Sequence, residues 1–382
     1  MKKTTANDKA RNWQRKRKKG IFMTKRNLNA DLIRCVAVFS VISVHFLLNG
    51  GFYKQEVCGI PMLVMCMYRS FFMTCVPLFL ILTGYLMGQK KLSKGYYKGL
   101  WKTIEIYLLA SIACLLFKKF VQEEDITIYS GLLSILAFKG ANYAWYIEMY
   151  IGLFCLIPFL NLIWQGLEDQ RQRKILVLTM IGLTMLPKML NNFNLVELSW
   201  WLHPAESDKY NKLVPSFFTA MYPITYYFVG RYLREYDWQI SRKKNLALLL
   251  MAVAVFGTYN YYRSYGGSFI WGSNSTWGGE NLITATLWFN LMLHLHPDRW
   301  PHFLQESMIY LSKISLGVYL ISWIFDKIVY QVYLIPYVSD ITARFKFYPL
   351  VVGAVFLASV GAASVLYLIR DGLHAGVRRI RG

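Results

Sequence analysis

The chain has 382 residues, of which 55% are hydrophobic, 16% aromatic and only 17% charged, with a formal net charge of +22. Apolar runs that approach the ~20 residues needed to cross a bilayer recur along it, which excludes a soluble core and predicts an all-α integral membrane protein. Basic side chains of membrane proteins collect in cytosolic loops, so we expect no nucleic-acid partner despite the positive charge.

Three regions follow from the distribution of charge. Residues 1–29 form a basic cytosolic tail that is too charged for a signal-peptide core, residues 30–370 form the transmembrane domain, and residues 371–382 form a second basic tail. The six cysteines show no metal-ligand spacing, and we expect no metal. Cys58 and Cys66 share one predicted loop and form a disulfide if that loop is external.

About ten transmembrane helices are predicted within the central region. They cover residues 30–50, 69–88, 102–121, 143–164, 174–190, 215–232, 245–262, 279–295, 309–332 and 348–370. Residues 128–138 are apolar but too short to span, and they predict a helix lying at the membrane interface. Lys and Arg are concentrated in the segments that share a side with the N-terminus, which predicts that both termini are cytosolic.

The first span, "DLIRCVAVFSVISVHFLLNG", carries ionisable side chains where lipid would exclude them. At about 100° per residue, Arg34 and His45 differ by only about 20° around the helix, and Asp31 and Asn49 lie on the same stripe. Such a stripe indicates either a structural polar seam between helices or one wall of a functional cavity.

Depth in the membrane suggests partners for this stripe. Arg34 and Glu105 are expected at a similar depth near the cytosolic face, where they form an ion pair. His45 lies in the outer half of its span, and two carboxylates, Glu148 and Asp326, are predicted at the same depth. Either one is able to orient the imidazole or hold its proton, and depth alone leaves both open.

Two further groups of basic residues have competing interpretations. Arg69 is predicted to open the second span at the outer edge, either snorkelling to headgroups or facing the mouth of the His45 cavity. Lys94, Lys98 and Lys102 form a ridge before the third span. They are either ordinary positive-inside charge or an anchor for a phosphorylated cytosolic donor, and "RYLR" at 231–234 is a second such candidate.

The ordered set of these features resembles the membrane-bound acyltransferase family 3, the bacterial O-acyltransferases of surface polysaccharides. It comprises the first-span Arg and His, "VPLFLILTGYLMG", the basic stretch, "WYIEMYIGLFCLIPFLN" and "ISLGVYLIS", and covers residues 26–370. The resemblance implies a ten-helix core in the bacterial cell membrane, cytosolic acyl-CoA as donor (acetyl-CoA is expected) and an essential Arg34 and His45. Two departures stand out, because lysines replace an arginine pair common before the third span and Ser322 replaces a frequent His.

Under this resemblance the protein is an O-acyltransferase that acts on a hydroxyl of a cell-surface polysaccharide or a lipid-linked sugar, within membrane lipid and alongside polysaccharide-synthesis machinery. His45 is expected to act as general base with Glu148 or Asp326 as its orienter, and Arg69 to steady the acceptor or the developing oxyanion. The donor is expected to meet Arg34, Asp31, Glu105 and the three lysines. The alternative is an exporter or transporter of a polysaccharide or small solute, against which the absence of two related halves counts mildly.

Overall fold

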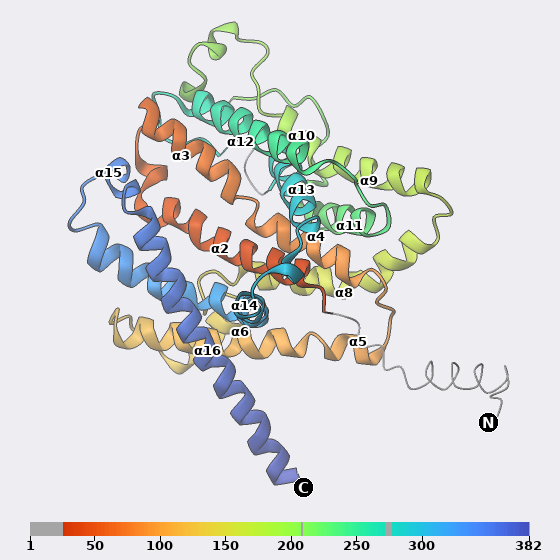
Figure 1. The fold of residues 1–382 in the computed structure, drawn as a ribbon. Helices are drawn as coiled ribbons and strands as arrows, with labels where there is room; N and C mark the ends of the chain where they lie inside the picture. The colour runs from red at the N-terminus through yellow and green to blue at the C-terminus, as the bar shows by residue number, and fades with distance from the viewer. Residues whose placement is uncertain (1–25, 208, 272–276, 382) are drawn as a thin grey trace, which may run out of the picture.

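The computed structural model describes residues 26–207, 209–271 and 277–381, and its regular structure is helical (Figure 1). Only two isolated β-bridges occur among these residues, between 56–57 and 265–268. The prediction of an all-α membrane protein is therefore confirmed. Most of the predicted basic tail, residues 1–25, lies outside the described part of the chain.

The helices follow one another with short connections. They are α2 (Leu28–Gly50), η1 (Phe52–Lys54), α3 (Gly59–Phe72), α4 (Cys75–Met87), α5 (Lys94–Lys98), α6 (Trp101–Phe120), α7 (Ile128–Leu136), α8 (Trp145–Gln165), α9 (Gln170–Thr184), α10 (Leu186–Leu190), η2 (Leu198–Trp201), η3 (Pro204–Glu206), η4 (Thr219–Met221), α11 (Tyr222–Glu235), α12 (Arg242–Ser264), α13 (Gly279–Leu293), η6 (Pro297–Arg299), α14 (His302–Ile328), η7 (Val329–Leu334), α15 (Ile341–Phe345) and α16 (Tyr348–Arg381).

Seven helical segments of the described chain are long and apolar enough to cross a membrane. The other three of the ten predicted spans fall on α9, α11 and α13, which have only 15, 14 and 15 residues. At 1.5 Å per residue these helices extend about 21–23 Å, less than the ~30 Å hydrocarbon core. The prediction at 128–138 corresponds to the short, largely exposed helix α7.

The second predicted span differs from the structure at its start. Its helical segment begins at Gly59 rather than residue 69, because α3 and α4 are consecutive helices broken only around Met73 and Thr74. Residues 59–69 are thus helical and not an external loop. Cys66 is buried in α3 while Cys58 is exposed at its N-terminus, and both are free thiols, so the suggested disulfide is absent.

Helix α2 lies in the centre of the bundle and packs against α4, α14 and α16 (Figure 1). It begins where the Asn27 side chain accepts a hydrogen bond from the Ala30 amide, and it ends at Gly51, whose φ of +98° closes the helix through the Leu47 carbonyl. Since glycine adopts this left-handed conformation without strain, it suits the turn into η1.

Helices α4 and α11 approach each other more closely than side chains normally allow. A Cβ on Gly84 would overlap the Tyr227 carbonyl, and a Cβ on Gly230 would overlap the Ile81 carbonyl. Small residues of this kind let membrane helices pack backbone against backbone. The contact fixes α4, which lines the cavity beside α2 described below, against α11.

We expect Gly230→Ala to destabilise the protein by about 1–3 kcal/mol, because the added methyl group meets rigid backbone. Thermal unfolding in detergent, followed by intrinsic fluorescence, measures the effect as a lower Tm. Gly152→Ala in α8 is the matched control, since a Cβ there has open space. Equal Tm values for the two variants would show that the close contact contributes nothing.

Helix α16 continues well past residue 370, where the sequence predicts a separate tail. It extends beyond the rest of the bundle at its C-terminal end (Figure 1). The predicted boundary between domain and tail is therefore not a helix end.

Candidate active site

His45 and Asp326 face each other across the interface between α2 and α14. His45 Nδ1 lies 3.5 Å from Asp326 Oδ2; the aspartate side chain is fully buried and the imidazole is 13% exposed. His45 Nδ1 and Asp326 Oδ1 have no hydrogen-bond partner among the described residues. A general base and its orienting carboxylate are often this loosely spaced before substrate binds.

Tyr143, which precedes α8, completes this arrangement. Its hydroxyl donates to Asp326 Oδ2 at 2.6 Å, and its ring centroid lies 4.0 Å from that of His45. The Asn49 side-chain amide donates to the same hydroxyl at 3.3 Å and to the His45 carbonyl at 3.1 Å. Tyr143 was not predicted as a site residue, although it is the first residue of the predicted fourth span, 143–164, close in sequence to Glu148.

The structure decides between the two candidate carboxylates. Glu148 is exposed, whereas Asp326 is buried against the imidazole. The reason is helical phase: Ile147, on the adjacent position of α8, points inward, so Glu148 points out of the bundle. Glu148 is therefore not the partner of His45.

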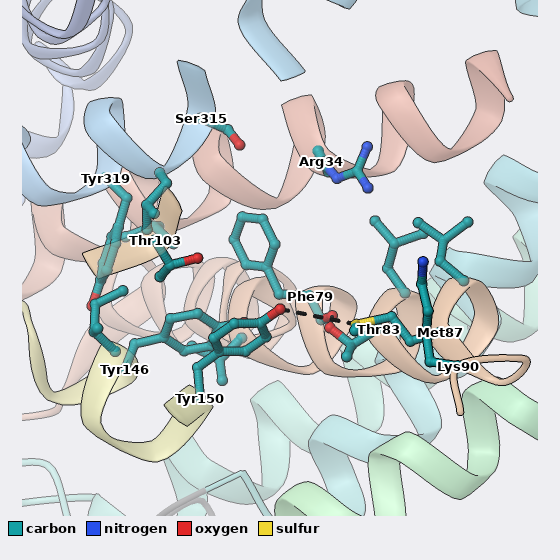
Figure 2. A pocket seen from close by; sticks show the side chains of 16 residues that line it. Arg34, Phe79, Thr83, Met87, Lys90, Thr103, Tyr146, Tyr150, Ser315 and Tyr319 are labelled. Atoms are coloured by element: carbon teal, nitrogen blue, oxygen red, sulfur yellow. Dashed lines mark hydrogen bonds between the residues drawn. The ribbon is translucent and has the colours of Figure 1, made fainter. Parts of the chain in front are cut away.

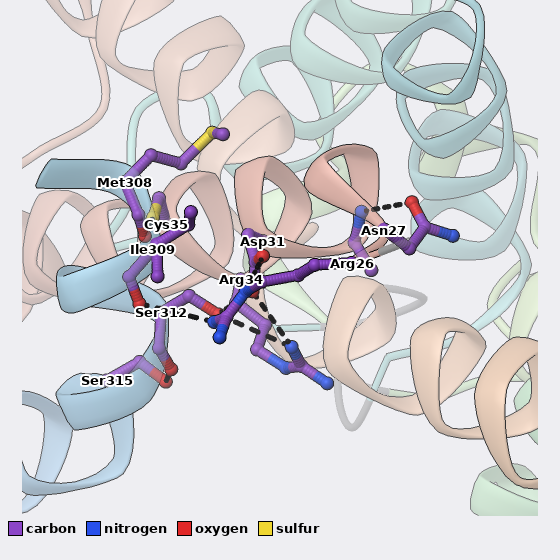
Figure 3. Close-up of polar contacts among 10 residues, drawn as sticks. Arg26, Asn27, Asp31, Arg34, Cys35, Met308, Ile309, Ser312 and Ser315 are labelled. Carbon is purple, nitrogen blue, oxygen red and sulfur yellow. Dashed lines mark hydrogen bonds and ion pairs between the residues drawn. The ribbon is translucent and has the colours of Figure 1, made fainter. Parts of the chain in front are cut away.

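The other end of the α2 stripe forms a second polar cluster (Figure 3). The buried Asp31 carboxylate accepts from Arg26 Nε at 2.6 Å and from the Ser312 hydroxyl at 2.6 Å, and lies 3.4 Å from Arg34 Nη1. Arg34 Nη1 also donates to the Ser312 hydroxyl at 3.3 Å. Asp31 and Ser312 therefore restrain the position of the Arg34 guanidinium.

The predicted pairing of Arg34 with Glu105 is wrong. Glu105 Oε2 lies 3.1 Å from His374 Nε2 on α16, while Arg34 uses Asp31 and Ser312. The two residues do lie near the same end of the bundle, but α14 provides the nearer polar partner for the guanidinium. A similar depth in the membrane was therefore not sufficient to identify the partner of Arg34.

A cavity of about 340 Å³ lies beside α2 (Figure 2). Arg34 and Lys90 lie toward one end of it, and Tyr146 and Tyr319 toward the other. The lining between them is mostly apolar, with residues of α4 and α8 opposite α2 and α14. A cavity with cations at one end and a mostly apolar lining beyond them suits a long ligand that carries an anionic group at one end.

Two tyrosines, Tyr143 and Tyr319, lie between this cavity and His45. Val41, one turn before His45 on α2, lines the cavity, as does Tyr319. The Tyr319 hydroxyl donates to the Tyr143 carbonyl, and the Tyr143 ring packs on the imidazole. Along α2 the cavity lining therefore ends about one helical turn from His45, and along α14 it ends about two turns from Asp326.

The family comparison matches almost the whole chain. A family described as an acyltransferase domain, acyltransferase family 3, matches residues 27–368. The chain belongs to the membrane-bound acyltransferase family 3. Neither curated proteins nor solved structures give a match.

A second cavity of this acyltransferase, about 780 Å³, adjoins the first through shared lining residues Thr103 and Leu316. Lys98 and Lys102 line it together with Lys313 and the exposed Trp101. Lys94, at the start of α5, does not line it. Because α5 ends at Lys98 and α6 starts at Trp101, the predicted ridge is divided between two helices. Glu105 also lines this cavity, paired with His374.

Arg69 of the acyltransferase is fully buried in the last turn of α3, so it neither opens a span nor snorkels to lipid. Its Nε donates to the Tyr53 hydroxyl at 2.9 Å, and its guanidinium carbon lies 4.5 Å from the Phe269 ring centroid and 4.9 Å from that of Trp271. These aromatic faces stabilise the buried cation. The structure therefore gives Arg69 aromatic neighbours, and its observed contacts do not include His45.

Ser322, the departure from the family pattern in "GVYLIS", lies one turn before Asp326 on α14. Its buried hydroxyl donates to the Tyr319 carbonyl at 2.8 Å. Its hydrogen bond is therefore to the backbone of α14, the helix that carries Asp326. The Asp326 carboxylate is contacted by Tyr143 and His45.

Proposed function

We propose that this acyltransferase transfers an acyl group, with acetyl expected, from acyl-CoA to a hydroxyl of a cell-surface polysaccharide or lipid-linked sugar. The observation that carries the proposal is the cavity that starts at Arg34 and Lys90 and ends about one turn along α2 from His45, which faces Asp326. It occurs in a chain whose family is an acyltransferase family.

In the proposed orientation the N-terminal end of α2 faces the cytosol of a bacterial cell. The excess of Lys and Arg on that side supports this placement. The donor then enters from the cytosol, and the C-terminal end of α2, which carries His45, lies toward the outer side where a surface glycan is available.

The donor fits the two adjoining cavities. Lys98, Lys102 and Lys313 in the wider cavity match the phosphates of coenzyme A, and Trp101 offers an aromatic face for adenine. The pantetheine arm is long and narrow, as is required of a ligand that occupies the mostly apolar cavity beyond Arg34. In this scheme Asp31 contributes by holding Arg34.

His45 acts as general base in the proposed reaction. With Nδ1 directed at Asp326, Nε2 takes the proton of the acceptor hydroxyl as its oxygen attacks the thioester carbonyl. The C–S bond then breaks, the thiolate of coenzyme A leaves, and it receives the proton from the imidazolium. Asp326 stabilises the transient positive charge, and Tyr143 and Asn49 hold the carboxylate and the ring in position.

Inside-out membrane vesicles supplied with [14C]acetyl-CoA test this proposal. We expect label to become covalently attached to glycan or lipid-linked sugar, with release by mild base as expected for an ester. Vesicles carrying His45→Gln protein at an equal level are the control. Solute crossing the membrane without covalent transfer, in wild type and variant alike, would favour a transporter and overturn the proposal.

A further inference from the structure

A separate basic cavity lies at the end of the bundle where α4, α8 and α11 terminate and α9 begins. It measures about 510 Å³, and it shares no lining residue with the two cavities assigned to the donor. Its cations are Lys91, Arg173, Arg231 and Arg234. We call it the Arg231 pocket.

Arg231 is the unusual member because it is only 3% exposed. Its guanidinium carbon lies 5.4 Å from the Trp164 ring centroid, and its Nε has no hydrogen-bond partner among the described residues. Gly88 makes room for it, since a Cβ at that position would overlap the guanidinium. Glycine at the C-terminal end of α4 thus leaves room for this side chain, which lines the pocket.

Glu235, the one carboxylate among the described residues of the pocket, offsets only part of the positive charge. Glu235 lines the pocket, but one of its carboxylate oxygens is paired with Arg173 and the other accepts from Trp164 Nε1 at 2.8 Å. Four cations therefore face one carboxylate that is already engaged. A buried arginine in a site with more cations than carboxylates is costly, so an external anion is the physical complement of this site.

The surroundings favour a lipid as the source of that anion. Leu162 and Ile163, which directly precede Trp164 on α8, are exposed, as is Ile175 on α9 just after Arg173. These side chains offer apolar surface to acyl chains next to the cationic pocket. Basic pockets between transmembrane helices on the cytosolic side suit anionic headgroups.

We propose that the Arg231 pocket binds a phosphate group, and that an anionic phospholipid of the cytosolic leaflet supplies it. The assignment to that leaflet rests on the orientation given under the proposed function. Binding itself does not depend on acyl transfer, so it is measured without acyl-CoA or glycan.

Thermal unfolding of the full-length protein in a neutral detergent tests the site. Phosphatidylglycerol is added in one series, phosphatidylcholine in a second and inorganic pyrophosphate in a third. We expect phosphatidylglycerol to raise the wild-type Tm, phosphatidylcholine to have no such effect, and Arg231→Gln to lose most of the increase. Arg242→Gln, which removes an exposed cation at the start of α12, is the matched control and keeps the increase.

A second variant covers the case in which Arg231→Gln fails to fold. Gly88→Ala keeps every charge but displaces the guanidinium, and we expect it to lose the increase as well. Stabilisation by pyrophosphate alone, lost in Arg231→Gln, would support the phosphate site with a soluble anion as its source. Equal stabilisation of wild type and both variants, or no stabilisation of wild type by either anion, would overturn the proposal.

Discussion

Replacing His45 by Ala is expected to lower acyl transfer by about 10³-fold or more while leaving the fold intact. The reason is chemical: general-base catalysis contributes roughly 10²–10⁴-fold, and no other imidazole is seen in contact with Asp326 among the described residues. The measurement is the rate of labelled ester formation in membranes that contain equal amounts of wild-type and variant protein.

His302→Ala is the matched control for this substitution. His302 is also a histidine beside a carboxylate, 3.6 Å from Glu306, but its side chain is 83% exposed at the start of α14. We expect it to retain wild-type activity. Normal acylation by His45→Ala at normal protein level would remove the base from the proposed reaction.

Replacing Asp326 by Asn is expected to have the second-largest effect, a loss of about 10²–10³-fold. Asparagine preserves the size of the side chain and still accepts from the Tyr143 hydroxyl, but it lacks the charge that stabilises the imidazolium. Asp326→Glu restores the charge at a shifted position, so we expect partial recovery. Initial rates at saturating donor separate this loss from weakened donor binding.

Glu148→Gln distinguishes this role from a general effect of negative charge at the same depth. Glu148 is exposed on α8, and we expect its substitution to change the rate less than twofold. A loss in Glu148→Gln equal to that in Asp326→Asn would contradict the pairing of His45 with Asp326.

The polar stripe of α2, which consists of Asp31, Arg34, His45 and Asn49, makes contacts at both of its ends. At one end Asp31 and Arg34 contact Ser312, and at the other His45 faces Asp326, so both clusters use the single partner helix α14. The stripe thus makes polar contacts between helices and also lines a cavity, two features that the sequence leaves as alternatives. Asp31 is structural in its contacts, whereas Arg34 also lines the cavity.

The local pattern of the sequence was sufficient for the class of fold and for the polar face of the first helix. Apolar runs of membrane length predict helices because backbone groups in lipid must bond within their own segment. Helical periodicity then places Arg34 and His45 on one face, as the structure confirms. Both inferences depend only on neighbours along the chain.

Pairing across helices was decided by the tertiary structure. Depth along the bilayer ordered the candidates but carried no information on rotation or on which helices adjoin, so Glu105 was assigned to Arg34 and two carboxylates remained for His45. Packing places α14 beside α2 and turns Glu148 outward. It also brings Tyr143, which lies just before α8, against the imidazole. Contacts between distant segments depend on how all the helices pack together, which no single stretch of residues encodes.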